Sequence, residues 1–114
     1  MHTGAILIAQ ERDRQITDEG YTSGHDDGHS GSELAWAAAC YAAPGQVFEM
    51  KRYAGKVSFI DPWPWAPHFD KRPYNGNVMR EPRPDERVRC LVKAGALIAA
   101  EIDRLMRAGA TVGA

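Results

Sequence analysis

Two histidines and two aspartates lie close together in the segment His25–His29, which reads HDDGH. Carboxylates are the ligands that Mg²⁺ and Mn²⁺ prefer, and imidazole adds affinity for zinc or iron. Asp26 and Asp27, with Glu33 further along the chain, therefore form a candidate set of metal ligands. The same segment also has a purely structural interpretation, in which the aspartates accept hydrogen bonds from loop amides and the histidines lie at the surface.

A second candidate is the proline-rich segment that contains Trp63 and Trp65, with Lys71 and Arg72 close behind. Rigid aromatic rings stack on a nucleobase, and neighbouring cations form charge-assisted hydrogen bonds with phosphate. Lys93 is the single charged residue in the apolar stretch CLVKAGALIAA, so its ammonium group either snorkels to the surface or contacts an anion. In the alternative interpretation, the tryptophans fill the core under a proline-rich lid.

The elements that must position these residues centre on a helix predicted near residues 84–108. Pro84 suits the first helical position, Asp85 and Glu86 suit the positive end of the helix dipole, and Gly109 marks the end. Apolar residues recur between them at three- and four-residue spacing, which predicts one buried face. The residues of this predicted core face are Val88, Leu91, Val92, Gly95, Ile98, Ala99, Ile102, Leu105 and Met106, whereas Cys90, Ala94, Leu97 and Ala100 lie off it.

Another helix is predicted near residues 5–17, at the start of the chain. Ile6, Ala9 and Ile16 give it a partial apolar stripe, and the run ERDR gives it a polar one. Thr3 is positioned to cap this helix.

A third helix is predicted near residues 31–43, where Ser30 and Glu33 have the spacing of a capping box. This helix is rich in alanine and therefore thin, so we expect it to approach the small residues Ala94, Gly95 and Ala96 of the central helix closely. Replacing Gly95 by leucine should then overpack that contact and destabilise the fold by at least ~1–3 kcal/mol.

The remaining segments are predicted to be largely irregular. Residues 19–31 combine four glycines with polar side chains, which predicts a loop. Residues 61–83 hold five of the seven prolines and form a second long connection, in which three aromatic side chains argue against disorder. Residues 46–60 fit a short β-hairpin around Ala54 and Gly55. We expect the two loops to converge at one end of the helical bundle.

The composition indicates one ordinary globular domain, residues 1–114. Hydrophobic residues make up 44% and charged residues 25% of the chain, and the net charge of −1 gives no overall attraction to nucleic acid. Cys40 and Cys90 fall in predicted helix interiors, which favours buried thiols over a disulfide. No secretory signal or membrane span is recognisable, so a cytoplasmic protein is expected. The predicted fold is mainly α, a small single-domain helical bundle around a long C-terminal helix, with a glycine-rich loop, a Pro/Trp-rich loop and a short β-hairpin.

Several motifs together resemble those of a family of small phage and prophage proteins. They are Glu11-Arg12-x-Arg14-Gln15, Glu19-Gly20-Tyr21, the HDDxH segment, Glu33-Leu34-Ala35, the alanine run that follows, Trp63-Pro64-Trp65 and LVKAGALIAAEIDRL. The resemblance covers most of the chain and implies a phage setting, and hence the cytoplasm of a host cell, more than a particular reaction. Relatives run more directly from the tryptophans into the last helix, so residues 68–84 are an insertion that the resemblance does not cover.

A more distant similarity, at the level of fold, is to all-α nucleotide pyrophosphohydrolases of the MazG kind. Those enzymes hold magnesium with acidic pairs at ExxE and ExxD spacing, and neither pair occurs in this sequence. Such an enzyme would need a magnesium or manganese site built differently, from Asp26, Asp27 and Glu33.

These features lead us to expect a protein that binds and sequesters a nucleotide-like small molecule, for example a host defence signal, without a cofactor. In this interpretation the tryptophans stack on the base, the cations bind phosphates and the HDD segment binds ribose hydroxyls. The predicted ligand-binding residues are His25, Asp26, Asp27, His29, Trp63, Trp65, Lys71, Arg72 and Lys93. Two alternatives stay open, a metal-dependent MazG-like pyrophosphohydrolase and a protein–protein adaptor. We expect a homo-oligomer with no membrane partner and no general nucleic-acid binding.

Overall fold

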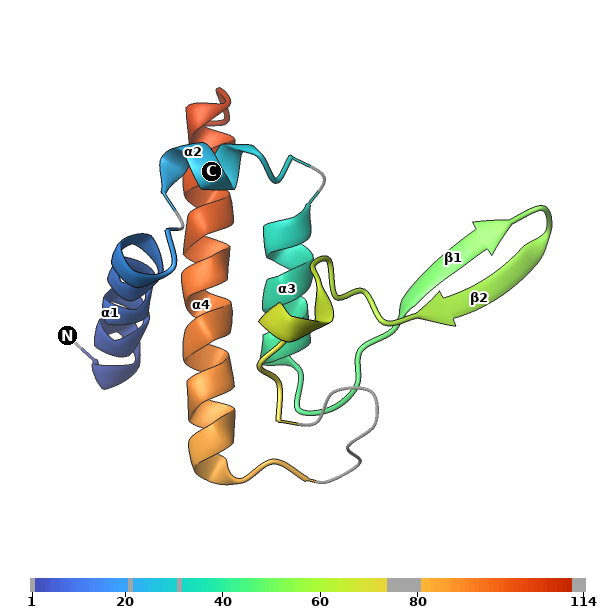
Figure 1. Cartoon of the computed structure of the whole chain (residues 1–114), viewed down its shortest axis with the longest axis horizontal. Helices are drawn as coiled ribbons and strands as arrows, with labels where there is room; N and C mark the ends of the chain where they lie inside the picture. Colours follow the sequence, from blue (N-terminus) through green and yellow to red (C-terminus); the bar gives the residue numbers. More distant parts are fainter. Residues whose placement is uncertain (1, 21, 31, 74–80, 112–114) are drawn as a thin grey trace.

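Helix α4, Pro84–Arg107, runs through the centre of the computed structural model, and the other helices lie around it (Figure 1). The structure describes residues 2–20, 22–30, 32–73 and 81–111. At the start of α4, Glu86 accepts a hydrogen bond from the amide of Arg83 at 3.0 Å. Beyond its end, Gly109 has a φ of +107°, a backbone conformation that favours glycine. Both predicted ends of the helix are confirmed, as is the mainly α-helical fold with a small two-stranded sheet.

The buried face of α4 differs from the predicted one. Its buried residues include four that lie off the predicted stripe, and these are Cys90, Ala94, Leu97 and Ala100. Most of the large residues on the predicted stripe are about half-exposed, namely Val88, Leu91, Ile98, Ile102, Leu105 and Met106. Val92 is the one residue of the predicted stripe that is buried, so the predicted core face is wrong for most of its residues. The buried residues are mostly small because α3 is alanine-rich, and two thin faces allow the helix backbones to approach closely.

Helices α1 (Thr3–Asp18) and α3 (Glu33–Ala42) flank α4 on opposite sides (Figure 1). Helix α3 buries Leu34, Ala38 and Tyr41 in one cluster with the small face of α4. The expected close contact between the alanine-rich helix and the central helix is present, and it forms most of the core.

Gly95 does not take part in that contact, and the prediction that it faces α3 is wrong. A Cβ atom built on Gly95 would lie 2.6 Å from Cδ1 and 2.8 Å from Cγ1 of Ile8. Those atoms belong to α1, so the close approach that requires a glycine is between α1 and α4. Larger side chains at position 95 would clash with Ile8.

Helix α1 buries polar residues where an apolar stripe was predicted. Ile6 and Ile16 are 38% and 37% exposed, whereas Glu11 and Gln15 are buried. The predicted cap is also wrong, because the helix begins at Thr3 and its N-cap, His2, makes no side-chain hydrogen bond to it.

The glycine-rich segment contains one short helix, α2 (Ser23–Asp27), which the loop prediction missed. The hydroxyl of Thr22 accepts a hydrogen bond from a backbone amide of α2 and caps it. The N-cap of α3 is Ser32, with a φ of +72° and no side-chain hydrogen bond to the helix. The predicted capping box at Ser30 is therefore wrong, because the left-handed turn at Ser32 delays the start of the helix.

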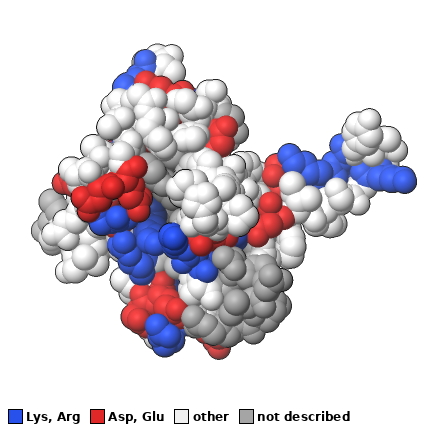
Figure 2. All heavy atoms as spheres, viewed as in Figure 1, with Lys and Arg blue, Asp and Glu red and all other residues white. Residues whose placement is uncertain are grey.

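Strands β1 (Glu49–Tyr53) and β2 (Lys56–Ile60) pair in an antiparallel hairpin, which confirms the predicted one. Ala54 and Gly55 form its turn with φ values of +51° and +78°, the signs that a tight two-residue hairpin turn requires. The hairpin projects from the helices as an arm, with basic side chains along it (Figures 1 and 2).

Residues 61–73 are irregular, as predicted, apart from one short 3₁₀ turn at Pro67–Phe69. Residues 74–80 of the insertion lie outside the described residues. Cys40 and Cys90 are free and buried, in agreement with the sequence. Within the described ranges, no helix has both the length and the apolar character that crossing a membrane would require.

Candidate functional site

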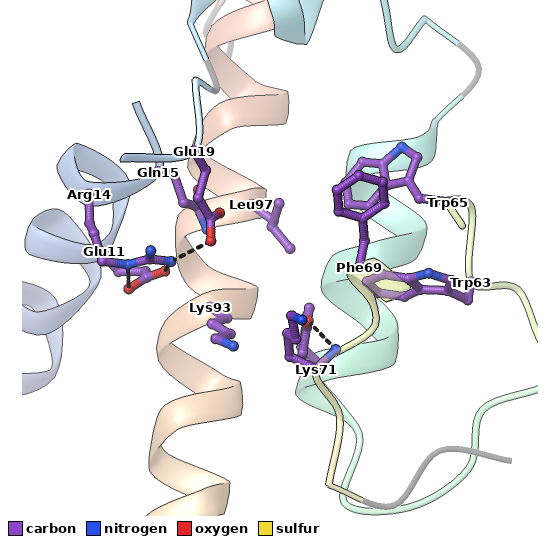
Figure 3. Close-up of a pocket in the computed structure, with 11 residues that line it drawn as sticks. Glu11, Arg14, Gln15, Glu19, Trp63, Trp65, Phe69, Lys71, Lys93 and Leu97 are labelled. Atoms are coloured by element: carbon purple, nitrogen blue, oxygen red, sulfur yellow. Dashed lines mark hydrogen bonds and ion pairs between the residues drawn. The ribbon is translucent and has the colours of Figure 1, made fainter. Parts of the chain in front are cut away.

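A cavity of about 240 Å³ lies between α1, α4 and the proline-rich segment, which crosses in front of α3 (Figures 1 and 3). This volume is slightly below the ~300–1,000 Å³ that is usual for small-molecule sites. The residues that line it are Glu11, Arg14, Gln15, Glu19, Tyr41, Trp63, Trp65, Phe69, Lys71, Lys93 and Leu97. Four of the predicted ligand-binding residues are among them, namely Trp63, Trp65, Lys71 and Lys93.

The aromatic wall of the cavity is held in place by hydrogen bonds within the proline-rich segment. The amide of Trp63 donates to Asp61 Oδ1 at 3.0 Å, and the indole Nε1 of Trp63 donates to the carbonyl of Ala66 at 3.2 Å. The Trp63 ring meets the rings of Tyr41 and Trp65 edge-on, each at 5.6 Å between centroids. Edge-to-face packing of this kind favours a fixed arrangement of rings.

Arg72 does not line the cavity, but its ion pairs hold the proline-rich segment in place. Its side chain is almost fully buried, and Nη2 donates to Asp70 Oδ2 at 2.7 Å and to Asp61 Oδ2 at 3.0 Å. The guanidinium carbon also lies 5.5 Å from the centre of the Trp63 ring. Burial raises the pKa of Asp61, but hydrogen bonds from the Trp63 amide, Gln46 and Arg72 outweigh burial and hold that pKa below its usual value. Arg72 thus positions Trp63.

On the opposite side of the cavity from the tryptophans, Glu11 lies beside Arg14 on α1 (Figure 3), and through Arg89 it also joins α1 to α4. Its carboxylate accepts hydrogen bonds from Arg14 Nη2 at 2.6 Å and from Arg89 Nη1 at 2.7 Å. Burial raises the pKa of Glu11, but these two arginines more than offset that effect and leave the pKa below its usual value. Arg14 also pairs with Glu19 at 3.1 Å. These charges are therefore satisfied within the protein.

The two lysines that line the cavity differ from Glu11 and Arg14 in having no salt-bridge partner among the described residues. No carboxylate within the described ranges forms a salt bridge with either ammonium group. Lys93 is half-buried, and its Nζ lies 5.3 Å from the centre of the Tyr41 ring. Burial lowers the pKa of Lys93, and the positive charge of Arg89 lowers it further. Lys71 is exposed, and its backbone amide donates to the Tyr41 hydroxyl at 3.0 Å.

Gln15 is the most unusual residue of the cavity. It is only 3% exposed, and its Oε1 atom is buried without a hydrogen-bond partner among the residues that the structure describes. An unsatisfied buried acceptor costs about 1–3 kcal/mol, so native proteins rarely retain one. Gln15 lies in the wall of the cavity, but Oε1 itself has almost no accessible surface, so the side chain must turn before a bound molecule can supply the missing donor.

The HDD segment lies outside this cavity. Asp26 is fully buried and accepts a hydrogen bond from Arg12 Nη2 at 2.9 Å, while His25 Nδ1 lies 3.1 Å from its other oxygen. Asp27 pairs with Arg107 at 2.8 Å. Both aspartates therefore tie α2 to neighbouring helices and do not face Trp63.

His29 is the member of the HDD segment that approaches the aromatic wall. Its ring centroid lies 5.3 Å from that of Trp65 and 4.7 Å from that of His25. The two loops that were expected to converge therefore meet at the His29–Trp65 contact, but the cavity beside them is lined by Lys93 and Leu97 from the middle of α4 and does not lie at an end of the bundle.

The metal-ligand set expected for the hydrolase alternative is not assembled. Asp26 and Asp27 bind different arginines, and Glu33 lines a separate hollow with Trp36 on α3. Among the described residues, no group of three or more His, Cys, Asp or Glu side chains is arranged to hold a metal ion.

Several lining residues were missed by the sequence analysis. Glu11, Gln15 and Glu19 are spaced by four residues, which places them on one side of α1 and its C-cap, so their spacing was an available signal. Tyr41 and Leu97 carried no comparable signal, because each lies in an apolar helix where burial alone explains it.

No protein-family model, curated protein or solved structure matches this chain. The resemblance to small phage and prophage proteins therefore stays a prediction, and the proposal below rests on the geometry of the cavity.

Proposed function

We propose that the cavity between α1, α4 and the proline-rich segment binds a nucleotide-like small molecule and retains it unchanged. The observation that carries this proposal is the buried side-chain amide of Gln15, a residue that lines the cavity and whose Oε1 has no hydrogen-bond partner in the described part of the chain. A side-chain amide offers an acceptor and a donor side by side, the pattern that reads the edge of a nucleobase.

The aromatic wall supports recognition of a base. Trp65 and Phe69 present rings to the cavity beside Trp63 (Figure 3). Stacking of a base on an aromatic side chain contributes roughly 1–3 kcal/mol. Because Arg72 fixes the wall, a ligand meets rings that are already positioned, which lowers the entropy cost of binding.

The two lysines support recognition of phosphate. Lys93 and Lys71 line the same cavity as the aromatic rings, and neither ammonium group is neutralised by a carboxylate within the described ranges. A phosphate next to Lys93 would favour its charged form and oppose the effect of burial on its pKa. Ligand binding should therefore weaken as pH rises through the pKa of Lys93.

Retention without turnover is supported by the acidic residues. Glu11 is held by Arg14 and Arg89, and the two aspartates of the HDD segment are held by other arginines. Carboxylates engaged in this way are poor ligands for the magnesium ions that assist phosphoryl chemistry. In a phage setting, a molecule held in this way could be a signal of the host defence.

The test is calorimetry with a panel of cyclic nucleotides and ADP-ribose derivatives, followed by denaturation and mass analysis of the recovered ligand. A member of the panel should bind and be recovered intact. Trp65→Ala should weaken its binding about tenfold or more, whereas Trp36→Ala, a matched change on α3 outside the cavity, should leave the affinity unchanged. Recovery of a cleaved ligand would show turnover, and a panel without any binding would leave the adaptor alternative as the better explanation.

The substitution Gln15→Met tests the role of Gln15 through two measurements, the stability of the ligand-free protein and the affinity for the ligand. A residue with a purely structural role would not change them in opposite directions. The change removes a buried acceptor without a partner and keeps the length of the side chain. We expect the ligand-free protein to become about 1 kcal/mol more stable, while the affinity for the ligand falls. Loss of stability together with unchanged affinity would contradict the role assigned to Gln15.

A further inference from the structure

One side of α4 presents a row of large apolar side chains to solvent, although the opposite side of the same helix forms the core. Five residues of this row are between 43% and 52% exposed, and they are Val88, Leu91, Ile98, Ile102 and Leu105. These residues follow one another by steps of three, seven, four and three residues, and the position between Leu91 and Ile98 is Gly95, which Ile8 of α1 covers. These steps are the spacing of a helix that packs along its length against another helix. We refer to the five exposed residues as the α4 seam.

A groove runs beside the α4 seam on the side of α3. It is formed by Ala35, Ala39 and Ala42 of α3 together with Ile98 and Ile102 of the seam, and it encloses about 260 Å³. Glu101 is the one charged residue that lines it, and this carboxylate is already paired with Arg104. Small alanines next to projecting isoleucines give a surface with both holes and knobs, which are the two parts of interlocking helix packing.

We propose that a second copy of this chain covers the α4 seam, so that the protein is a symmetric dimer with α4 packed against α4. In a two-fold dimer the same patch must fit itself, and a patch that carries both knobs and holes satisfies this requirement. The seam contains no charged residue, and an uncharged surface does not favour a nucleic acid or a strongly charged peptide as the partner.

The exposed area suits a reversible dimer. We take the fully exposed area of a large aliphatic residue as about 150 Å², the lower limit of the area that an aromatic side chain buries. With that value, the five half-exposed seam residues and Met106 together expose on the order of 400 Å² per copy. This is already a large apolar patch for a monomer. Ile98 and Ile102 of the α3 groove are already counted, so two copies would bury on the order of 800 Å² of apolar surface, which is below the ~1,200 Å² of standard interfaces and fits a weak complex. We therefore expect dissociation in the micromolar range.

Such a dimer leaves the ligand cavity free. Lys93 and Ile98 are five residues apart, so at ~100° per residue their side chains leave α4 about 140° apart. The cavity lies on the side of Lys93, and this face of the molecule carries charges of both signs (Figure 2). Two copies joined by their seams would therefore carry two outward-facing cavities.

The experiment is sedimentation velocity on the full chain over a range of concentrations, from about 1 to 500 µM. The wild-type protein should approach about 25 kDa, twice the 12.6 kDa of the monomer, as the concentration rises. Ile102→Glu should weaken dimerisation at least ~100-fold, because the substituted residue enters a symmetric interface twice. The matched control is Phe59→Glu, a change of an exposed apolar residue on the hairpin, which should leave the dimer intact.

The experiment distinguishes a dimer that forms through the α4 seam from a monomer and from a dimer that forms through another surface. A wild-type protein that stays at 12.6 kDa over the whole range overturns the proposal, and so does a dimer that Phe59→Glu abolishes. Circular dichroism should show that Ile102→Glu keeps its helices. If that variant does not fold, Ile102→Thr keeps the branched shape of the side chain and should still weaken the dimer about tenfold, whereas an unchanged dissociation constant would overturn the assignment to the α4 seam.

Discussion

Replacing Gly95 by alanine should destabilise the protein, and the same replacement should stabilise it once Ile8 is shortened to alanine. In the wild-type background, the new Cβ would lie 2.6 Å from Cδ1 and 2.8 Å from Cγ1 of Ile8, so the Ile8 side chain or the whole of α1 must move. Overpacking of this kind costs about 1–3 kcal/mol. Alanine in a helix interior is favoured over glycine by about 1 kcal/mol, which offsets part of that cost. We expect a net destabilisation of about 1 kcal/mol.

In the Ile8→Ala background, all three atoms that crowd position 95 are absent, because they are Cδ1, Cγ1 and Cγ2 of Ile8. The preference of the helix for alanine then acts alone, and Gly95→Ala should stabilise the protein by about 1 kcal/mol. The coupling between the two substitutions is therefore about 2 kcal/mol.

The assay is urea unfolding followed by circular dichroism, with the wild type, both single variants and the double variant at one protein concentration. The fixed concentration matters because a dimer would make the apparent stability depend on it. An equal effect of Gly95→Ala in both backgrounds would show that position 95 does not contact Ile8, and the placement of α1 against α4 would then be wrong.

Three further outcomes are expected. Arg87→Met should lower the free energy of unfolding by about 2 kcal/mol in urea titrations, because Arg87 donates to the carbonyls of Ala42 at 2.7 Å and Ala43 at 3.0 Å and thereby satisfies the end of α3. The folded-state pKa of Glu11 is below its usual value of 4.5, so the ionised carboxylate stabilises the fold above pH 4.5 and this stabilisation is lost as the pH falls toward the folded-state pKa. The free energy of unfolding of Glu11→Gln should therefore fall less steeply with decreasing pH than that of the wild type. Burial raises the pKa of the Cys40 thiol to about 11 although Arg72 opposes the shift, so Cys40 should react with a thiol reagent at pH 8 only after unfolding, and fast labelling of the native protein would contradict its burial.

The parts of the fold that are determined by residues close together in the chain could be predicted from the sequence. Pro84 and Gly109 define the ends of α4, and Ala54 with Gly55 defines the hairpin turn, because each acts through its own backbone conformation. The buried side of α4 could not be predicted in the same way. A helix that is apolar on most sides fits neighbours on several of them, and the side that α3 occupies depends on the alanines of α3.

The burial of polar residues on α1 could not be predicted from the sequence either. Charge usually indicates a solvent-exposed face, yet Glu11 is buried because Arg14 and Arg89 neutralise it. Arg89 is 78 positions away in the chain, so this pairing is not visible in local sequence.

The candidate site was predictable only by residue type. Aromatic rings and cations do line one cavity, at Trp63, Trp65, Lys71 and Lys93. Arg72 is adjacent to Lys71 in sequence and has the same charge, but it is enclosed by two aspartates and supports the wall. The difference between the two residues depends on where the chain turns after Pro67–Phe69, which single-sequence patterns do not specify.

The central position of α4 has a consequence for the order in which this chain can fold. The extensive helix–helix contacts of the described residues all involve α4, yet α4 follows every one of its partners in the sequence. Leu34 and Tyr41 are buried against it, and Asp27 binds Arg107 across 80 positions. On the ribosome, the N-terminal helices therefore emerge before the surface that buries them exists, and contacts of such long sequence separation form slowly. The domain can close only after the last helix has been synthesised, and until then its apolar residues are open to chaperones and proteases.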